Sequence, residues 1–165
     1  MYSLGDCVVY GIHGVCRVAG YEKQLVGRKR TEYLVLEPLN QNESRYYLPT
    51  ANPTAMGKLK SILSAEEMRA LLASDEIRQG NWISDENQRK QHYRDLISGG
   101  DRVSVLQTVC ALYRYRAEQA AAGRKFHQCD DNFLRDAEKL LSSEIALVLD
   151  MTPEEARDYL RQQLK

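Results

Sequence analysis

The chain has 165 residues and a formal net charge of zero at pH 7, a length that fits one ordinary domain or two small ones. Its 43% hydrophobic and 28% charged residues are typical of a globular protein with a real core. No run approaches the ~18 apolar residues of a membrane helix, and the N-terminus lacks a basic flank followed by an apolar run. We therefore expect no membrane association, no signal peptide and a cytoplasmic location.

The first fifty residues favour β-structure. Strands are expected over Cys7 to Tyr10, Val15 to Val18, Thr31 to Glu37 and Arg45 to Pro49. The connecting segments, at 11–14, 27–30 and 40–43, are rich in glycine, asparagine or charged residues. Short strands with β-branched and aromatic residues between such turns indicate a small antiparallel barrel or sandwich.

After Pro49 and Pro53 the pattern becomes helical. Helices are expected over 64–72, 89–97 and 101–123, then from Asp130 or Asp131 onward, and finally from Thr152. Ser64 and Thr152 each begin a capping box, and residues 75–87 have no regular pattern. The chain therefore predicts the α+β class, with a β-domain at 1–52, a linker at 53–63 and a helical domain at 64–165.

His13, in the segment Gly11-Ile12-His13-Gly14, has two interpretations. As a catalytic base it would have to lie within ~3 Å of Cys7 or Cys16, with a third group orienting the ring. As a turn residue it needs only the neighbouring glycines, which tolerate unusual backbone angles. The chain has no phosphate-binding glycine loop, H-E-x-x-H motif or nucleophile elbow. We expect no enzyme, and a cysteine–histidine hydrolase stays as an alternative.

The four cysteines, at 7, 16, 110 and 129, form no C-x-x-C pair and have no histidine pair at zinc-ligand spacing. Cys7 and Cys110 fall within apolar runs, where cysteine acts as a small buried hydrophobe. We therefore expect no disulfide, no metal and no cofactor.

The middle of the chain is basic. Residues 86–125 contain eight Lys/Arg and four Asp/Glu, whereas residues 126–165 contain five and nine. The candidate phosphate-binding side chains are Arg89, Lys90, Arg94, Arg114, Arg116, Arg124 and Lys125. The alternative for all of them is a solvated helix face.

Trp82, the only tryptophan, lies in the irregular segment before these basic helices. We predict that it binds DNA as a wedge between base pairs, and the alternative is a hydrophobic anchor for the segment.

Five stretches of the chain resemble a known family. The segments LGDCVVYGIHGVCRV, EYLVLEPL and RYYLP are similar to the RNA-polymerase-interacting domain of CarD/CdnL-type bacterial transcription regulators, a Tudor-like module also found in the transcription-repair coupling factor. RKQHYRDLISGGD and EKLLSSEIALVLDMTPEEA resemble the helical C-terminal domain of the same regulators. The two halves occur in the family's order and span nearly the whole chain.

The resemblance implies a non-enzymatic regulator. Its Tudor-like or SH3-like barrel would bind the RNA polymerase β subunit by adding a strand edge, around either Glu32 to Leu36 or Arg45 to Leu48. The helical domain would contact promoter DNA at the upstream edge of the melted region and change the lifetime of the open complex. The implied polymerase-binding residues are Lys23, Glu32, Tyr33, Val35, Arg45 and Tyr47.

Two positions depart from the family pattern. The family's wedge tryptophan directly precedes the basic helix, whereas five residues, 83–87, intervene here. Tyr47 replaces a basic residue of the docking strand, and Arg45, two residues earlier on the same face, is the candidate substitute.

We expect a monomer whose DNA binding is weak, sequence-tolerant and salt-sensitive. The alternative is a protein-interaction module that binds RNA polymerase without touching DNA.

Overall fold

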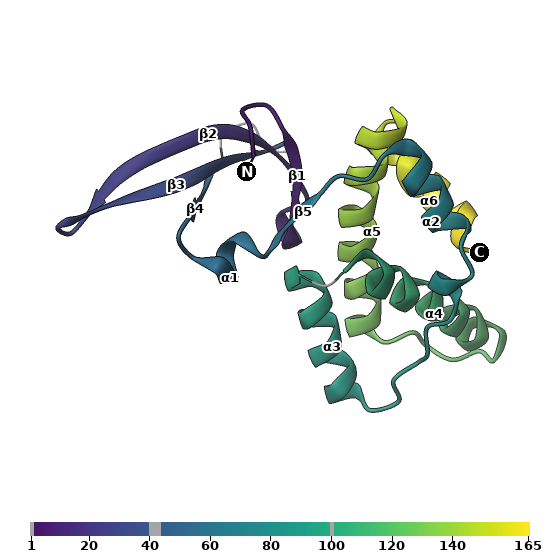
Figure 1. Cartoon of the computed structure of the whole chain (residues 1–165). Coiled ribbons are helices and arrows are strands. Elements are labelled where there is room, and N and C mark those ends of the chain that lie inside the picture. The colour runs from purple at the N-terminus through teal and green to yellow at the C-terminus, as the bar shows by residue number, and fades with distance from the viewer. Residues whose placement is uncertain (1, 40–43, 100) are drawn as a thin grey trace. The chain divides into compact units, whose positions relative to one another are not determined.

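The computed structural model describes residues 2–39, 44–99 and 101–165. It divides into two compact units, Met1–Ile62 and Leu63–Lys165, each of which has its own apolar core (Figure 1). The expected turn at 40–43 lies outside the described residues.

The first unit is built on one antiparallel sheet. Its strands are β1 (Cys7–Tyr10), β2 (Val15–Val26), β3 (Lys29–Pro38), β4 (Tyr46–Pro49) and β5 (Leu59–Ser61). Their order across the sheet is β4-β3-β2-β1-β5. The α+β class is confirmed, since helices follow the sheet. The described strand pairings do not close a barrel, because β4 pairs only with β3, and β5 only with β1.

The core of the first unit follows the two-residue period of its strands. Alternate side chains point to one face of the sheet and are fully or nearly fully buried, among them Val18, Leu34, Leu36 and Leu48. The β1–β2 connection is a 3-10 turn, Gly11–His13, flanked by positive φ angles of 44° at Gly11 and 71° at Gly14. The glycines are therefore required by the backbone, as the sequence predicted for this turn.

The segment 53–63, expected as a linker, contains a short helix and a strand. Asn52 caps a one-turn helix, α1 (Pro53–Met56), by accepting hydrogen bonds from the amides of Thr54 and Ala55. Strand β5 then pairs with β1 at the edge of the sheet. Three residues are too short for a recognisable alternation, so only the pairing identifies β5 as part of the first unit.

Strands β2 and β3 are longer than predicted and continue as a two-stranded ribbon. The register pairs Lys23 with Glu32, Leu25 with Arg30 and Val26 with Lys29, so only Gly27 and Arg28 form the turn. Gly27 has a φ of 65°, which suits the first position of a two-residue hairpin loop. All side chains from 21 to 30 are exposed, so no buried face imposes an alternating pattern on the sequence.

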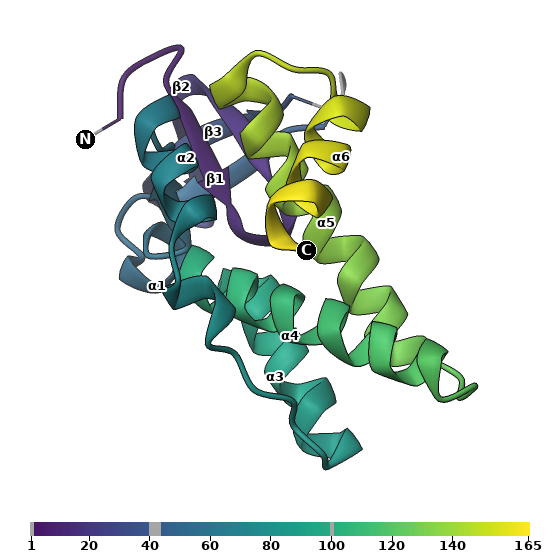
Figure 2. The same cartoon turned by 90° about the vertical axis from the view of Figure 1, so that its right-hand side faces the viewer.

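The second unit is helical. Its helices are α2 (Ala65–Ala73), α3 (Glu86–Gly99), α4 (Arg102–Ala121), α5 (Gln128–Leu149) and α6 (Pro153–Leu164), with a 3-10 turn at Glu76–Arg78. The two predicted capping boxes are confirmed. Helix α5 begins earlier than predicted, with His127 at the N-cap, and Figure 2 shows α6 packed along it. In the described ranges no helix is long and apolar enough to cross a membrane.

Candidate functional site

The face of the first sheet that points away from the core carries a cluster of side chains from β3 and β4. Val35 pairs with Tyr47 in the β3–β4 register, and the rings of Tyr33 and Tyr47 lie edge to face with centroids 6.3 Å apart. Leu34 and Leu36, which alternate with these residues, point into the core. We call Tyr33, Val35, Arg45 and Tyr47, with their acidic neighbours Glu22 and Glu37, the outer sheet face.

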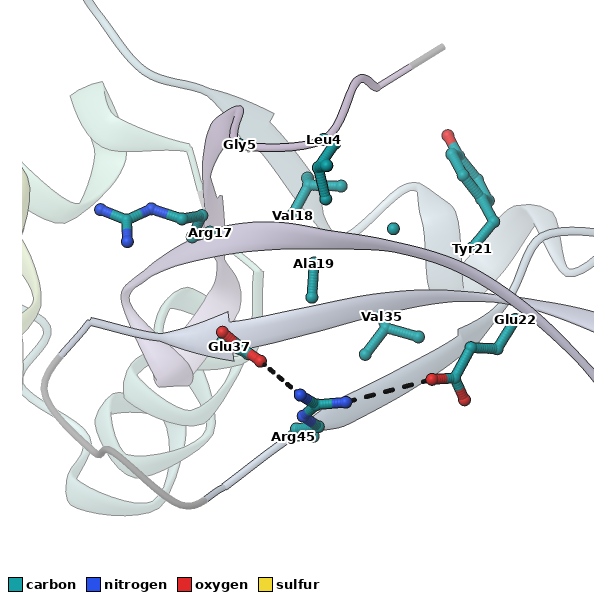
Figure 3. A pocket seen from close by; sticks show the side chains of 11 residues that line it. Leu4, Gly5, Arg17, Val18, Ala19, Tyr21, Glu22, Val35, Glu37 and Arg45 are labelled. Carbon is teal, nitrogen blue, oxygen red and sulfur yellow. Dashed lines mark ion pairs between the residues drawn. The ribbon is translucent and has the colours of Figure 1, made fainter.

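Arg45 lies beside a shallow pocket of about 430 Å³ on the outer sheet face. Its guanidinium forms ion pairs with Glu37 at 2.9 Å and Glu22 at 4.0 Å (Figure 3). All three side chains are about half exposed, and ion pairs of this kind contribute ~0–1 kcal/mol. Arg45 can therefore exchange these carboxylates for those of a partner at little cost.

Lys23 and Glu32 do not belong to the outer sheet face. They are cross-strand partners, and Glu32 has the parity of the core-facing Leu34. The Glu32 carboxylate accepts a hydrogen bond from the Thr50 hydroxyl at 3.1 Å. The structure thus brings together four of the six predicted polymerase-binding residues and places the other two on the opposite face.

The sheet offers one of the two predicted edges. Residues Glu32 to Leu36 belong to β3, which is paired with β2 on one side and β4 on the other, so this predicted edge is wrong. Strand β4 pairs only with β3 among the described strands, and its other side is open to strand addition.

His13 and Cys16 each have a structural role. The His13 ring lies 4.1 Å from the ring of Tyr46 and 5.0 Å from that of Tyr10, and partial burial lowers the pKa of His13. Cys16 is completely buried and donates a hydrogen bond to the Gly14 carbonyl. Burial, with a smaller contribution from Cys7, raises the pKa of Cys16 to about 11, so the thiolate needed for nucleophilic attack is scarce at neutral pH. The described part of the chain contains no group of three ligating side chains for a metal.

In the helical unit, Arg89 is buried rather than exposed to a phosphate. Its Nε donates to Asp130 at 2.8 Å, while another of its nitrogens donates to the carbonyl of Ile83 at 3.1 Å. The Tyr93 hydroxyl donates to the same Asp130 carboxylate at 2.6 Å. Arg89 is 3% exposed and Asp130 0%, so this structure does not present the Arg89 guanidinium, a predicted phosphate ligand, to solvent.

The protonation states of this buried group follow from its contacts. Burial by itself would lower the pKa of Arg89, but the hydrogen bond and charge of Asp130 outweigh it and raise the pKa. Burial raises the pKa of Tyr93 strongly, and the hydrogen bond to Asp130 adds to the effect. The charged Arg89 and the neutral Tyr93 phenol therefore both donate hydrogen bonds to Asp130 inside the unit.

Arg114 is also committed to the fold, although it is exposed. Its two terminal nitrogens donate to the carbonyls of Arg78 at 3.1 Å and Gly80 at 2.6 Å. A Cβ atom at Gly80 would lie 2.2 Å from the Gln107 carbonyl oxygen, so this approach requires glycine. These hydrogen bonds hold the segment between α2 and α3 against α4. Because both terminal nitrogens of Arg114 are used in them, Arg114 is not free to bind phosphate.

Trp82 is packed between two side chains. Its ring is stacked on Tyr115 with centroids 3.6 Å apart and planes 12° apart, and the Arg89 guanidinium lies 4.2 Å from the indole centroid. Because the stacked Tyr115 ring fills one face, the guanidinium occupies the other. Trp82 is partly buried against the helical core. These contacts support the anchor interpretation, and a base could stack on Trp82 only after the indole leaves one of its neighbours.

The remaining predicted DNA-binding cations differ in their contacts with other side chains. Lys90 pairs with Glu86 at 3.3 Å on the exposed side of α3, and Arg94 lies one turn further on. The Arg116 guanidinium lies 5.3 Å from the Tyr113 ring. Arg124 and Lys125 are exposed and immediately precede Phe126, whose ring is 6.3 Å from Tyr115.

Comparison with known protein families agrees with this two-part arrangement. Residues 2–60 match the model of the CarD-like/TRCF RID domain, and residues 66–161, more than half of the chain, match that of the CarD C-terminal domain. The chain belongs to the CarD-like family. No curated protein matches it. CarD-like proteins are non-enzymatic transcription regulators that interact with RNA polymerase.

The structure of this CarD-like chain adds residues that the sequence did not single out. Asp130 holds Arg89 from 41 positions away, and Tyr115 supports Trp82. At the sequence level Asp130 was only an acidic residue near a helix start. Tyr115 lies between Arg114 and Arg116 in the sequence, where nothing signals stacking on Trp82, so neither pair was detectable.

Proposed function

We propose that this CarD-like protein docks on the β subunit of RNA polymerase through its outer sheet face and the open edge of β4. Its helical unit then contacts promoter DNA at the upstream edge of the melted region and changes the lifetime of the open complex. The observation that carries the proposal is the exposed aromatic and arginine cluster beside an open strand edge, within the segment that matches the polymerase-interacting family.

The chemistry of the outer sheet face suits a protein partner. Tyrosine and arginine are the residues that most often dominate binding energy at protein interfaces. Tyr47 exposes 42% of its surface, while Val35, only 1% exposed, supports the cluster from below. Addition of a partner strand along β4 would supply main-chain hydrogen bonds, and Tyr47 and Arg45 would give specificity.

The DNA contact is assigned to four exposed cations of the helical unit, Lys90, Arg94, Arg124 and Lys125. Lys90 and Arg94 are four residues apart on α3 and therefore lie on one side of that helix. Each phosphate that such a side chain neutralises adds about −0.9 to the slope of log K against log salt. Contacts of this kind do not read base sequence, so binding is weak and sequence-tolerant.

Trp82 has an indirect role in DNA binding: it holds the segment before α3, the helix that carries Lys90 and Arg94. Its stacking on Tyr115 and the Arg89 guanidinium keeps that segment rigid. Insertion between base pairs would exchange these two contacts for contacts with bases, at a further cost of a few kcal/mol for unstacking the duplex.

A protein-interaction module that binds polymerase without DNA is the second candidate. It is favoured by the finding that Arg89 and Arg114, two of the seven candidate phosphate-binding cations, serve the fold instead. The salt titrations described below separate it from the main proposal, because such a module would show no DNA binding that depends on the cations of α3.

The polymerase contact is tested by titrating the full-length chain against purified polymerase and against its β subunit. Tyr47→Asp is expected to weaken binding at least tenfold, because a charge replaces an exposed aromatic contact. Leu147→Asp is the matched control, since Leu147 on α5 is 41% exposed. Equal affinities for the two variants, or no binding of the wild-type chain to the β subunit, would contradict the proposal.

A further inference from the structure

The β2–β3 ribbon extends beyond the part of the sheet that the other strands support. Strand β4 pairs with β3 only from Tyr33 to Leu36, whereas β2 and β3 stay paired with each other out to Val26 and Lys29. Figure 1 shows the two strands continuing together as an arm to their shared turn. A two-stranded ribbon without a third strand is marginally stable by itself, so a partner that grips it would stabilise it.

The tip of the arm combines exposed apolar side chains with cations. Leu25 is 70% exposed and Val26 54%. The cations are Lys23, Arg28, Lys29 and Arg30, and none of them forms an ion pair with another described residue. From 23 to 31 the arm contains no acidic residue. Its partner is therefore an anion or an anionic surface.

The two faces of the tip are alike. Cross-strand partners share a face, so Leu25 and Arg30 lie on one side of the ribbon, and Val26 and Lys29 on the other. A flat protein surface would cover only one apolar residue and one cation and leave the other pair in water. A groove with two anionic walls would contact both faces at once.

We propose that this arm enters a groove of duplex DNA. The major groove, about 12 Å wide, admits a two-stranded ribbon, and phosphates line both of its walls. Arg30 and Lys29 would then reach opposite phosphate walls, while Leu25 and Val26 meet the base edges, where thymine methyl groups offer apolar contact.

An anionic membrane fits the tip less well. Arg28 lies in the turn itself, beyond Leu25 and Val26. Insertion of the tip into lipid would therefore carry a guanidinium deeper than the apolar side chains, which is costly.

The inference rests on the proposed function in one respect: a chain bound to RNA polymerase has duplex DNA within reach.

The arm is tested by fluorescence anisotropy with the full-length chain and a duplex oligonucleotide, over a range of salt concentrations and without polymerase. The variant Arg28→Ser, Lys29→Thr, Arg30→Thr is expected to reduce the magnitude of the slope of log K against log salt by about 1.8, because Lys29 and Arg30 each neutralise one phosphate. The control, Arg69→Ser, Lys139→Ser, Arg157→Ser, removes the same charge from exposed positions of the helical unit and is expected to change the slope by less than about 0.5.

A second variant, Leu25→Ser with Val26→Thr, keeps the charge and is expected to weaken binding several-fold with an unchanged slope. Equal slopes for the two triple variants would overturn the inference. An unchanged DNA slope with lost polymerase affinity in the arm variant would also overturn it, and would assign the arm to an acidic protein surface. Polymerase affinity, measured in parallel, shows separately whether the proposed docking fails.

Discussion

The two units use arginine in opposite ways. In the β unit, Arg45 pairs with Glu37 and Glu22 at the surface, where all three side chains are about half exposed. In the helical unit, Arg89 pairs with Asp130, and both are almost completely excluded from water. An exposed pair can exchange partners, whereas a buried pair holds the fold together because each unpaired charge would be costly. The surroundings of a cation therefore decide whether it is available for binding.

The largest expected effect comes from breaking the buried pair. Arg89→Met leaves the Asp130 carboxylate buried without its partner and is expected to lower the free energy of unfolding of the helical unit by ~3–5 kcal/mol. Arg45→Met is expected to change stability by less than ~1 kcal/mol. Urea unfolding, followed for the helical unit by the fluorescence of Trp82, measures the first effect, and far-UV circular dichroism measures both. Similar losses for the two variants would remove the distinction.

The next largest expected effect is the loss of stability when the Trp82 side chain is removed. Trp82→Ala is expected to cost ~2 kcal/mol of stability, less than for a fully buried tryptophan because the side chain is only partly buried. A double-mutant cycle with Tyr115→Leu, measured by circular dichroism, should give a coupling energy of ~0.5–1.5 kcal/mol, as stacked rings do. An unchanged melting temperature together with a lost effect on the open complex would instead support the wedge.

Exposed cations of α3 and the fold-bound Arg114 should differ in a DNA salt titration. Lys90→Ala with Arg94→Ala is expected to lower the magnitude of the slope by about 1.8 without loss of stability. Arg114→Ala is expected to leave the slope unchanged and to lower stability by ~1–2 kcal/mol, because it releases the carbonyls of Arg78 and Gly80. A slope that depends on Arg114 but not on Lys90 and Arg94 would reverse the assignment.

The smallest effect concerns the β unit at mildly acidic pH. Burial lowers the pKa of His13 from its ordinary value of 6.5, so the unfolded chain takes up the proton first as the pH falls. Stability should therefore decline as the pH drops through about 6.5 and level off below the folded pKa. His13→Asn should remove this part of the pH dependence, as measured by thermal unfolding between pH 8 and pH 5. A steeper decline in the variant would show that the sign is wrong.

The sequence was informative where one physical signal dominates. Runs of β-branched and aromatic residues between turns predicted β1, β3 and β4, and capping boxes at Ser64 and Thr152 located the starts of α2 and α6. The β2–β3 ribbon was missed because exposed strands have no alternation, and β5 because three residues are too few.

The site was less predictable than the fold, because the hydrogen bonds and ion pairs of a side chain depend on residues far away in the sequence. Nothing near Arg89 in the sequence points to Asp130, and nothing near Arg114 points to the carbonyl of Gly80. The resemblance to the family supplied the residues of the outer sheet face, and strand parity added only that Arg45 and Tyr47 share one face.

We propose that the two units act together on one transcription complex. The half-life of a promoter open complex, measured after addition of a competitor, tests it most directly. The wild-type chain should change the half-life, and both Tyr47→Asp and the pair Lys90→Ala, Arg94→Ala should each abolish most of that change, whereas Leu147→Asp should retain it. No change of the half-life by the wild type would contradict joint action of the two units. A change by either binding-surface variant as large as that by the wild type would contradict it as well.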